Sequence, residues 1–203
     1  LRPYVTLRGD VEALDTYTAP RLDAAVHLDR LPTGQVTAQV TLGYGGRCAA
    51  YDGAPESWQD PLAELPLRMV LDRYFSGRLG DDTLVGTWED DTLFDFLTHG
   101  MERLQQLAQV TAADGFRRFG LAPTPHVKLG VSLVDDVLRM TVDVGDLDRA
   151  ELAGIIAGYR NNRLYHRLKD GRLMPLTDSA LAPLAELAEG LALSPAALQA
   201  GQI

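Results

Sequence analysis

Residues 21–44 read RLDAAVHLDRLPTGQVTAQVTLGY, and this stretch decides the fold that we expect for the first half of the chain. Apolar side chains recur at every second position of both arms: Leu22, Ala24, Val26 and Leu28 in the first, and Val36, Ala38, Val40 and Leu42 in the second. Such alternation is typical of a strand with one buried face. Between the arms, the Pro-Thr-Gly run at 32–34 supplies turn residues. We therefore predict an antiparallel hairpin.

Two helical segments are expected after this hairpin. The first covers residues 62–76, with core candidates at Leu62, Leu65, Met69, Leu71 and Tyr74. Pro66 favours a start later than Leu62, because a helix tolerates proline in its first turn but not in its interior. The second covers residues 91–108, where apolar side chains recur at steps of three and four: Phe94, Leu97, Met101, Leu104 and Ala108.

The second half of the chain repeats the mixture of hairpins and helices. Residues 127–133 and 137–144 alternate and predict one hairpin, and residues 146–159 predict a helix. Residues 164–176 carry Asp170-Gly171 between two alternating arms, which is the strongest hairpin signal in the chain. Two C-terminal helices follow, the second capped by Ser194.

These elements predict an α+β fold in which antiparallel hairpins or a sheet pack with several helices. The proline-bearing segment 121–125 is the expected boundary between two parts. Residues 1–122 form the N-terminal α+β part, with a strand pair plus helices, and residues 123–203 form the C-terminal α+β part, with hairpins plus helices. One continuous domain is the alternative.

The composition is that of a globular protein, with 203 residues of which 46% are hydrophobic. No apolar run approaches the roughly 18–20 residues of a membrane helix, so we expect no membrane partner. Cys48 is the only cysteine, which excludes an intrachain disulfide and favours the cytoplasm. The net charge of -9 argues against wholesale coating of nucleic acid, but it leaves room for a local basic patch. The start at Leu1 suggests a piece of a longer polypeptide.

The motifs of common active sites are incomplete or missing. The stretch GYGGRC at 43–48 has a cysteine where a dinucleotide loop needs its third glycine, and GVSLV at 130–134 has a valine where a nucleophile elbow needs its second. A GxxxxGK phosphate loop is absent, and no histidine has a partner at metal-binding spacing. We therefore predict no catalytic residue, no metal and no cofactor in this segment, and a free-standing enzyme is disfavoured.

A basic stretch stands out in this acidic chain. Residues 159–172 read YRNNRLYHRLKDGR, with five cations against one carboxylate. The candidate contact residues are Arg160, Arg163, Arg167, Lys169 and Arg172, with Tyr165 as a stacking side chain. Strand alternation is expected to put Tyr165, Arg167 and Lys169 on one face, and Leu164, His166 and Leu168 on the other. Two interpretations stay open: contact with DNA phosphates, or pairing with carboxylates of the same chain or of another domain.

The sequence YHRLKDGRLMPL at 165–176 resembles the signature of the bacterial Swi/Snf-type helicase-associated domain. Residues 94–121 and 127–171 are similar to the helix, paired strands and hairpin that surround this signature. The resemblance implies an accessory segment N-terminal to an ATP-dependent Swi/Snf-type DNA translocase motor, often behind a zinc-binding module. It supplies no catalytic residue. ATP and Mg are expected for the motor, outside this chain.

The resemblance and the residues together predict a non-catalytic accessory domain of a bacterial helicase or translocase. It would contact DNA or the motor domain of the same polypeptide. The alternative is a protein-interaction or architectural module with no nucleic-acid role, which the acidic average favours.

Overall fold

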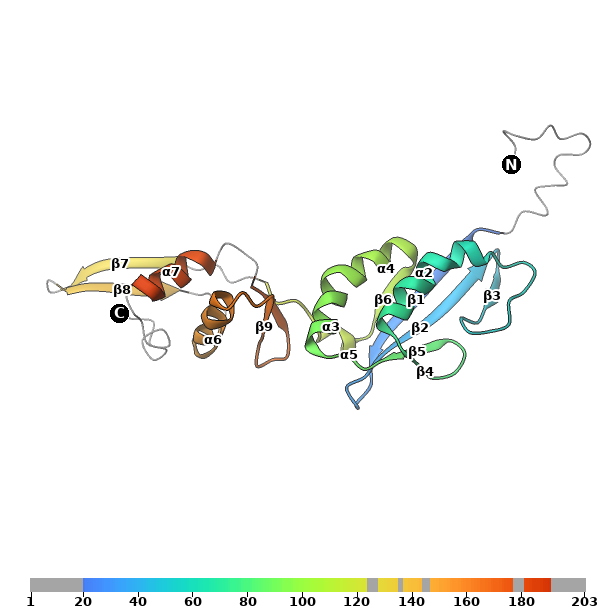
Figure 1. Ribbon diagram of the computed structural model, residues 1–203, viewed down its shortest axis with the longest axis horizontal. Helices are drawn as coiled ribbons and strands as arrows, with labels where there is room; N and C mark the ends of the chain where they lie inside the picture. The colour runs from blue at the N-terminus through green and yellow to red at the C-terminus, as the bar shows by residue number, and fades with distance from the viewer. Residues whose placement is uncertain (1–19, 124–127, 135–136, 144–146, 177–180, 191–203) are drawn as a thin grey trace, which may run out of the picture. The chain divides into compact units, whose positions relative to one another are not determined.

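A computed structural model describes residues 20–123, 128–134, 137–143, 147–176 and 181–190. The chain divides into two compact units, Leu1–Arg117 and Arg118–Ile203. Both units combine strands with helices (Figure 1), which confirms the predicted α+β class. Among the helices of the described residues, none has the length and apolar character needed to span a membrane.

The first unit is built on a six-stranded sheet. Its strands are β1 (Leu22–Arg30), β2 (Val36–Tyr44), β3 (Arg47–Ala49), β4 (Gly77–Arg78), β5 (Thr83–Gly86) and β6 (Gln109–Ala112). The order is β4-β5-β2-β1-β6, and β3 pairs with β2 beside this path. The predicted hairpin is confirmed, since β1 and β2 pair antiparallel with Val26 opposite Val40. In contrast, β6 lies parallel to β1.

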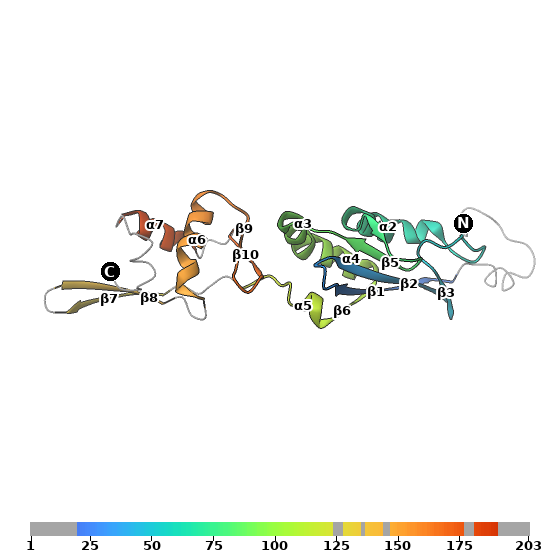
Figure 2. The ribbon, with the colours of Figure 1, turned by 90° about the horizontal axis from the view of Figure 1, so that it is seen from below.

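Helices cover one face of this sheet. They are α2 (Pro61–Tyr74), α3 (Asp90–Asp95), the π-helix η1 (Phe96–Gly100), α4 (Met101–Leu107) and α5 (Asp114–Arg117). Figure 2 shows α2 and α3 on the same side of the strands. The alternation predicted from sequence is confirmed, because Val26, Leu28 and Val40 are buried while His27, Gln39 and Thr41 face outward and are exposed. One face of the sheet is therefore the core wall, and the other is polar.

Helix α2 differs from its prediction in both start and buried face. It begins at Pro61, because the Asp60 carboxylate accepts hydrogen bonds from the Leu62 and Ala63 amides and proline fits the first helical position. Pro66 therefore lies inside the helix. Three of the five core candidates were wrong: Leu62, Leu65 and Met69 are 80%, 50% and 67% exposed. The buried side consists of Glu64, Leu67, Leu71 and Tyr74.

The predicted helix at 91–108 exists, but a wide π turn interrupts it at Phe96–Gly100. The extra residue of such a turn rotates the later residues, so the buried stripe differs from the regular one predicted. Phe94 and Leu104 are buried as expected, whereas Leu97, Met101 and Ala108 are only partly buried. Phe96 and Gly100 take inner positions instead.

The second unit contains two separate hairpins and two helices. Its elements are β7 (Lys128–Val134), β8 (Val137–Asp143), α6 (Arg149–Arg160), β9 (Tyr165–Arg167), β10 (Leu173–Pro175) and α7 (Ala182–Gly190). Strands β7 and β8 pair antiparallel, as do β9 and β10, and both predicted hairpins are confirmed. The helix predicted after Ser194 lies outside the described residues.

The core of the second unit joins the β9-β10 hairpin to the helices. Its buried residues are Ala122, Ile155, Leu168, Met174, Leu176 and Leu181, with Leu147 and Tyr159 packed against them. Ala122 also donates its amide to the Leu173 carbonyl at 2.8 Å. The segment at 121–122 thus packs with residues of the second unit. The division at residues 122 and 123 stays a prediction.

Candidate contact surface around the basic hairpin

The Lys169-Asp170-Gly171 run forms the turn between β9 and β10. The Leu168 amide donates to the Arg172 carbonyl at 2.9 Å, and the Gly171 amide donates to the Leu168 carbonyl at 2.9 Å. Gly171 has a φ of 88°, in the left-handed region that glycine adopts without a steric cost. The family-like signature therefore has a structural role first, because it closes this hairpin.

Lys169 holds the turn against the start of α6. Its Nζ lies 2.7 Å from Asp148 Oδ2, and its backbone amide donates to Glu151 Oε1 at 2.5 Å. The hydrogen bond from Lys169 lowers the pKa of the Asp148 carboxyl and raises the pKa of Lys169 itself. Asp148 also caps α6 by accepting from the Ala150 amide. The first predicted contact cation is therefore paired with a carboxylate of its own unit.

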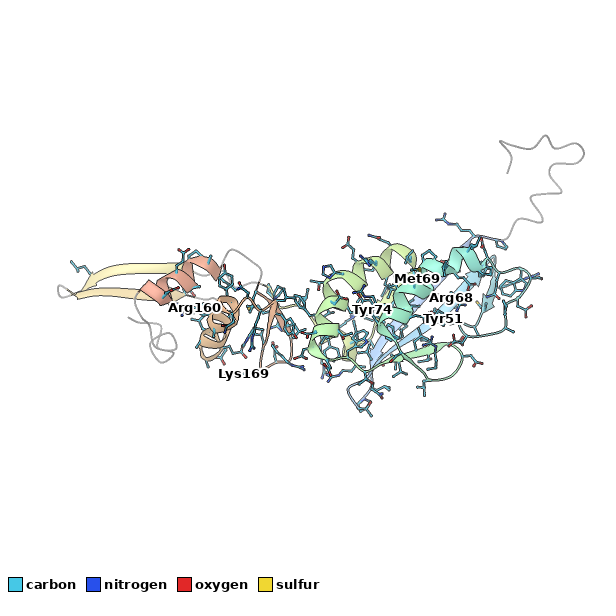
Figure 3. All side chains as sticks on the ribbon, in the orientation of Figure 1. Tyr51, Arg68, Met69, Tyr74, Arg160 and Lys169 are labelled. Atoms are coloured by element: carbon cyan, nitrogen blue, oxygen red, sulfur yellow. The ribbon has the colours of Figure 1, made fainter. Side chains whose placement is uncertain are left out.

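Arg172 and Arg160 have carboxylate partners as well. Arg172 Nε donates to Asp170 Oδ2 at 2.7 Å, and the Arg172 amide donates to the same carboxylate. These bonds lower the pKa of Asp170, the backbone bond most strongly. Arg160 Nη2 lies 3.6 Å from Glu189 Oε2 and donates to the Ala185 carbonyl, linking α6 to α7. Figure 3 shows Arg160 beside α7 and Lys169 beside the hairpin, so the predicted cations do not form one patch.

Arg163, Arg167 and Tyr165 complete the predicted set. Arg163 and Arg167 are exposed, and Tyr165 is partly buried. The predicted alternation holds for Arg167 and Lys169 outward and for Leu168 inward, but Leu164 is 59% exposed. The prediction was wrong there because β9 begins only at Tyr165, so Leu164 precedes the strand.

A groove of about 600 Å³ lies between the end of α6, the start of the hairpin and α7. Arg160 and Arg163 line it together with Glu186 and Glu189 from α7. Tyr159, Leu164 and Leu176 add apolar surface. The two glutamates are missed by sequence reasoning, because they follow the basic stretch by more than a dozen positions and no spacing rule links them to it. The result is a mixed surface of opposite charges around apolar side chains.

His166 lies under α6, close to a glycine. A Cβ on Gly154 would lie 2.9 Å from His166 Cε1, so the absence of a side chain lets the helix approach the hairpin. Burial lowers the pKa of His166, which keeps the ring neutral at pH 7. In the part of the chain that the structure describes, no group of three or more His, Cys, Asp or Glu side chains could hold a metal ion.

Comparison with known proteins agrees with this arrangement of hairpins and helices. A family model described as "Bacterial SNF2 helicase associated" matches residues 3–203. Searches among curated proteins and among solved structures gave no match.

Proposed function

Because the chain belongs to the bacterial SNF2 helicase-associated family, we propose that it is a non-catalytic accessory segment of an ATP-dependent DNA translocase of the Swi/Snf type. The motor, with its ATP and Mg, lies elsewhere in the same polypeptide. The segment contributes contacts rather than chemistry. The single exposed Cys48 supports a cytoplasmic location, where a free thiol stays reduced.

We further propose that the groove of the second unit contacts a protein surface of the motor. One observation carries this choice: three of the five cations lie within 4 Å of carboxylates, as the pairs Arg160–Glu189, Lys169–Asp148 and Arg172–Asp170. Exposed pairs of this kind are weak, so their strength is not the reason. The reason is that each carboxylate cancels the field that would attract a phosphate.

The apolar lining of the groove supports the same choice. Leu164 is 59% exposed at a surface that Tyr159 and Leu176 also line. A protein partner can bury such side chains and pair with the arginines and glutamates around them, which is the usual composition of a protein interface. A DNA backbone offers phosphates and would be repelled by Glu186 and Glu189.

The test uses the full-length polypeptide and two variants of the groove, Leu164→Asp and Arg163→Glu. A photo-crosslinking residue at Asn162, which lines the groove, reports contact with the motor. We expect both variants to lower the cross-link yield and to leave DNA affinity unchanged at low salt. Equal yields in the parent and both variants would contradict the proposed contact.

DNA contact is the second candidate, and a specific observation favours it. Arg163 is exposed, and no carboxylate of the described residues forms an ion pair with it; Arg167 is exposed as well. Two arginines on phosphates would steepen the dependence of log K on log salt by about 2. The double variant Arg163→Glu with Arg167→Glu therefore separates the candidates: a weaker affinity with a shallower slope favours DNA contact, and an unchanged slope favours the motor.

A further inference from the structure

Helix α2 carries an apolar ridge on its outer side. The ridge consists of Leu62, Leu65, Pro66 and Met69, all exposed to solvent. Leu62 is 80% exposed and Met69 is 67% exposed. Since 3.6 residues complete a turn, these positions share one side of the helix, opposite the buried stripe of Glu64, Leu67 and Leu71. Figure 3 marks Met69 on this helix.

A helix of a globular protein that is apolar on both sides is normally buried on both sides. In α2 the inner side packs on the sheet, while the outer side has only solvent among the described residues. Single exposed leucines are common, but four apolar side chains in a continuous row are the mark of a contact surface.

The charges around the ridge are neutralised within the first unit. Arg68 Nη2 lies 2.7 Å from Glu64 Oε2, and Arg73 Nη2 lies 2.9 Å from Asp95 Oδ2. On the same helix, Asp72 pairs with Arg78 at 2.9 Å. The ridge is thus an uncharged strip with neutral borders, and it is complementary to an apolar surface without net charge. Nucleic acid does not fit it, because no cation is available for phosphates.

The ridge is also rigid before any partner arrives. The Asp60 cap fixes the start of α2, and the buried Glu64 side chain holds its middle by accepting from Tyr44 at 2.8 Å. A pre-ordered helix loses little conformational entropy on binding, so a small surface can suffice.

We propose that this ridge docks an apolar, uncharged surface of the motor in the same polypeptide. The inference rests on the proposed function, but it concerns another unit and another kind of contact. The size of the ridge selects the occupant. Stable interfaces between separate molecules use about 20–30 residues a side, and four side chains are far fewer. A tethered partner is present at an effective concentration of about millimolar, so a small apolar contact is occupied. The net charge of -9 on each copy also opposes self-association.

The test places a photo-crosslinking amino acid at Met69 in the full-length protein. The matched control site is Leu79, another large apolar side chain, which is 60% exposed and lies outside α2. A mixture of isotope-labelled and unlabelled protein separates cross-links within one polypeptide from those between copies. We expect cross-links from Met69 to motor peptides of the same polypeptide, with a yield several-fold above that from Leu79.

The substitution Leu65→Asp should lower the Met69 yield about tenfold, because burial of one leucine is worth at least that factor. Leu65 is already half exposed, so the fold tolerates the change. Cross-links to a second copy, cross-links to DNA, or equal yields from Met69 and Leu79 would each overturn the proposal. If only the Met69 cross-links fail while the groove still cross-links to the motor, the ridge proposal alone is lost. If both fail, the proposed function is lost with it.

Discussion

Tyr44 and Glu64 share a hydrogen bond of 2.8 Å between the sheet and α2, where the Glu64 side chain is only 3% exposed. The second carboxylate oxygen accepts two bonds from the Arg68 guanidinium, and Gln59 donates to the first. A buried carboxylate is tolerated only when its oxygens are paired in this way. Glu64 therefore links the loop before α2, the helix and the last residue of β2.

We predict that Glu64→Ala destabilises the chain by about 2–3 kcal/mol, because Tyr44 and Arg68 lose their acceptor in a partly buried place. Glu64→Gln should cost less, since the amide oxygen still accepts from Tyr44. Urea unfolding followed by circular dichroism measures both. Equal stability of the Ala variant and the parent would show that water replaces the carboxylate at no cost.

Gly100 should be the least replaceable residue of the interrupted helix. An added Cβ would lie 2.7 Å from Phe96 Cδ2 and 2.8 Å from Tyr74 Cε2, both in buried rings. We expect Gly100→Ala to lower the free energy of unfolding by about 1–3 kcal/mol through overpacking, despite the better helix propensity of alanine. Thermal unfolding checks this, with the exposed Gln105→Ala as a control expected within about 0.5 kcal/mol of the parent.

Gly171→Ala tests the structural role of the signature turn. The φ of 88° would cost alanine about 1–2 kcal/mol. Gly171→Asn should cost less, because asparagine tolerates the left-handed region better than other side chains do. The measurement is amide exchange of Leu168, whose hydrogen bond to Arg172 closes the turn. If alanine leaves this exchange unchanged, the turn does not depend on glycine.

Tyr44 and Tyr51 predict a loss of stability in alkali. Burial raises the pKa of each phenol to about 12. Between pH 10 and 12 the folded phenols keep their protons while those of the unfolded chain lose them, so the free energy of unfolding falls as pH rises through this window. Denaturant titrations at several alkaline pH values measure the slope. The Tyr51→Phe variant should have a shallower slope than the parent, and an identical slope would contradict the assignment.

Lys169→Met tests the link between the turn and α6. Without the ammonium group, the pKa of the Asp148 carboxyl should rise toward its ordinary value, which a carboxyl NMR titration follows. The ion pair contributes only above the pH at which Asp148 ionises and is lost as pH falls through the pKa of that carboxyl in the folded state. Arg167→Met is the matched control, and it should leave the Asp148 titration unchanged.

The hairpins were predictable from sequence because alternation and turn residues act locally. Val26 and Val40 meet across β1 and β2 as the pattern requires, and Gly171 sits where the turn needs a left-handed residue. The buried face of α2 was not predictable, because the helix is apolar on two sides and its inner side includes Glu64. Similarly, a regular helical period cannot anticipate the wide turn that moves Phe96 inward.

The candidate site was predictable as a list of residues but not as a surface. The sequence groups Arg160, Lys169 and Arg172 into one basic stretch, whereas the fold directs them to different neighbours. Glu189 and Asp148 come from segments on either side of that stretch. Whether the surface binds the motor or DNA depends on this pairing in space, which no local pattern contains.

The parallel strand β6 has a consequence for synthesis of the protein. His27 on β1 bonds to Thr111 on β6, 84 positions later. A ribosome that has produced the first hairpin therefore still has to make both covering helices before β1 gains its second neighbour. Until Ala112 has left the exit tunnel, the edge of β1 stays available to other strands. Slow or interrupted translation of residues 45–112 is thus the stage at which this segment is most exposed to aggregation.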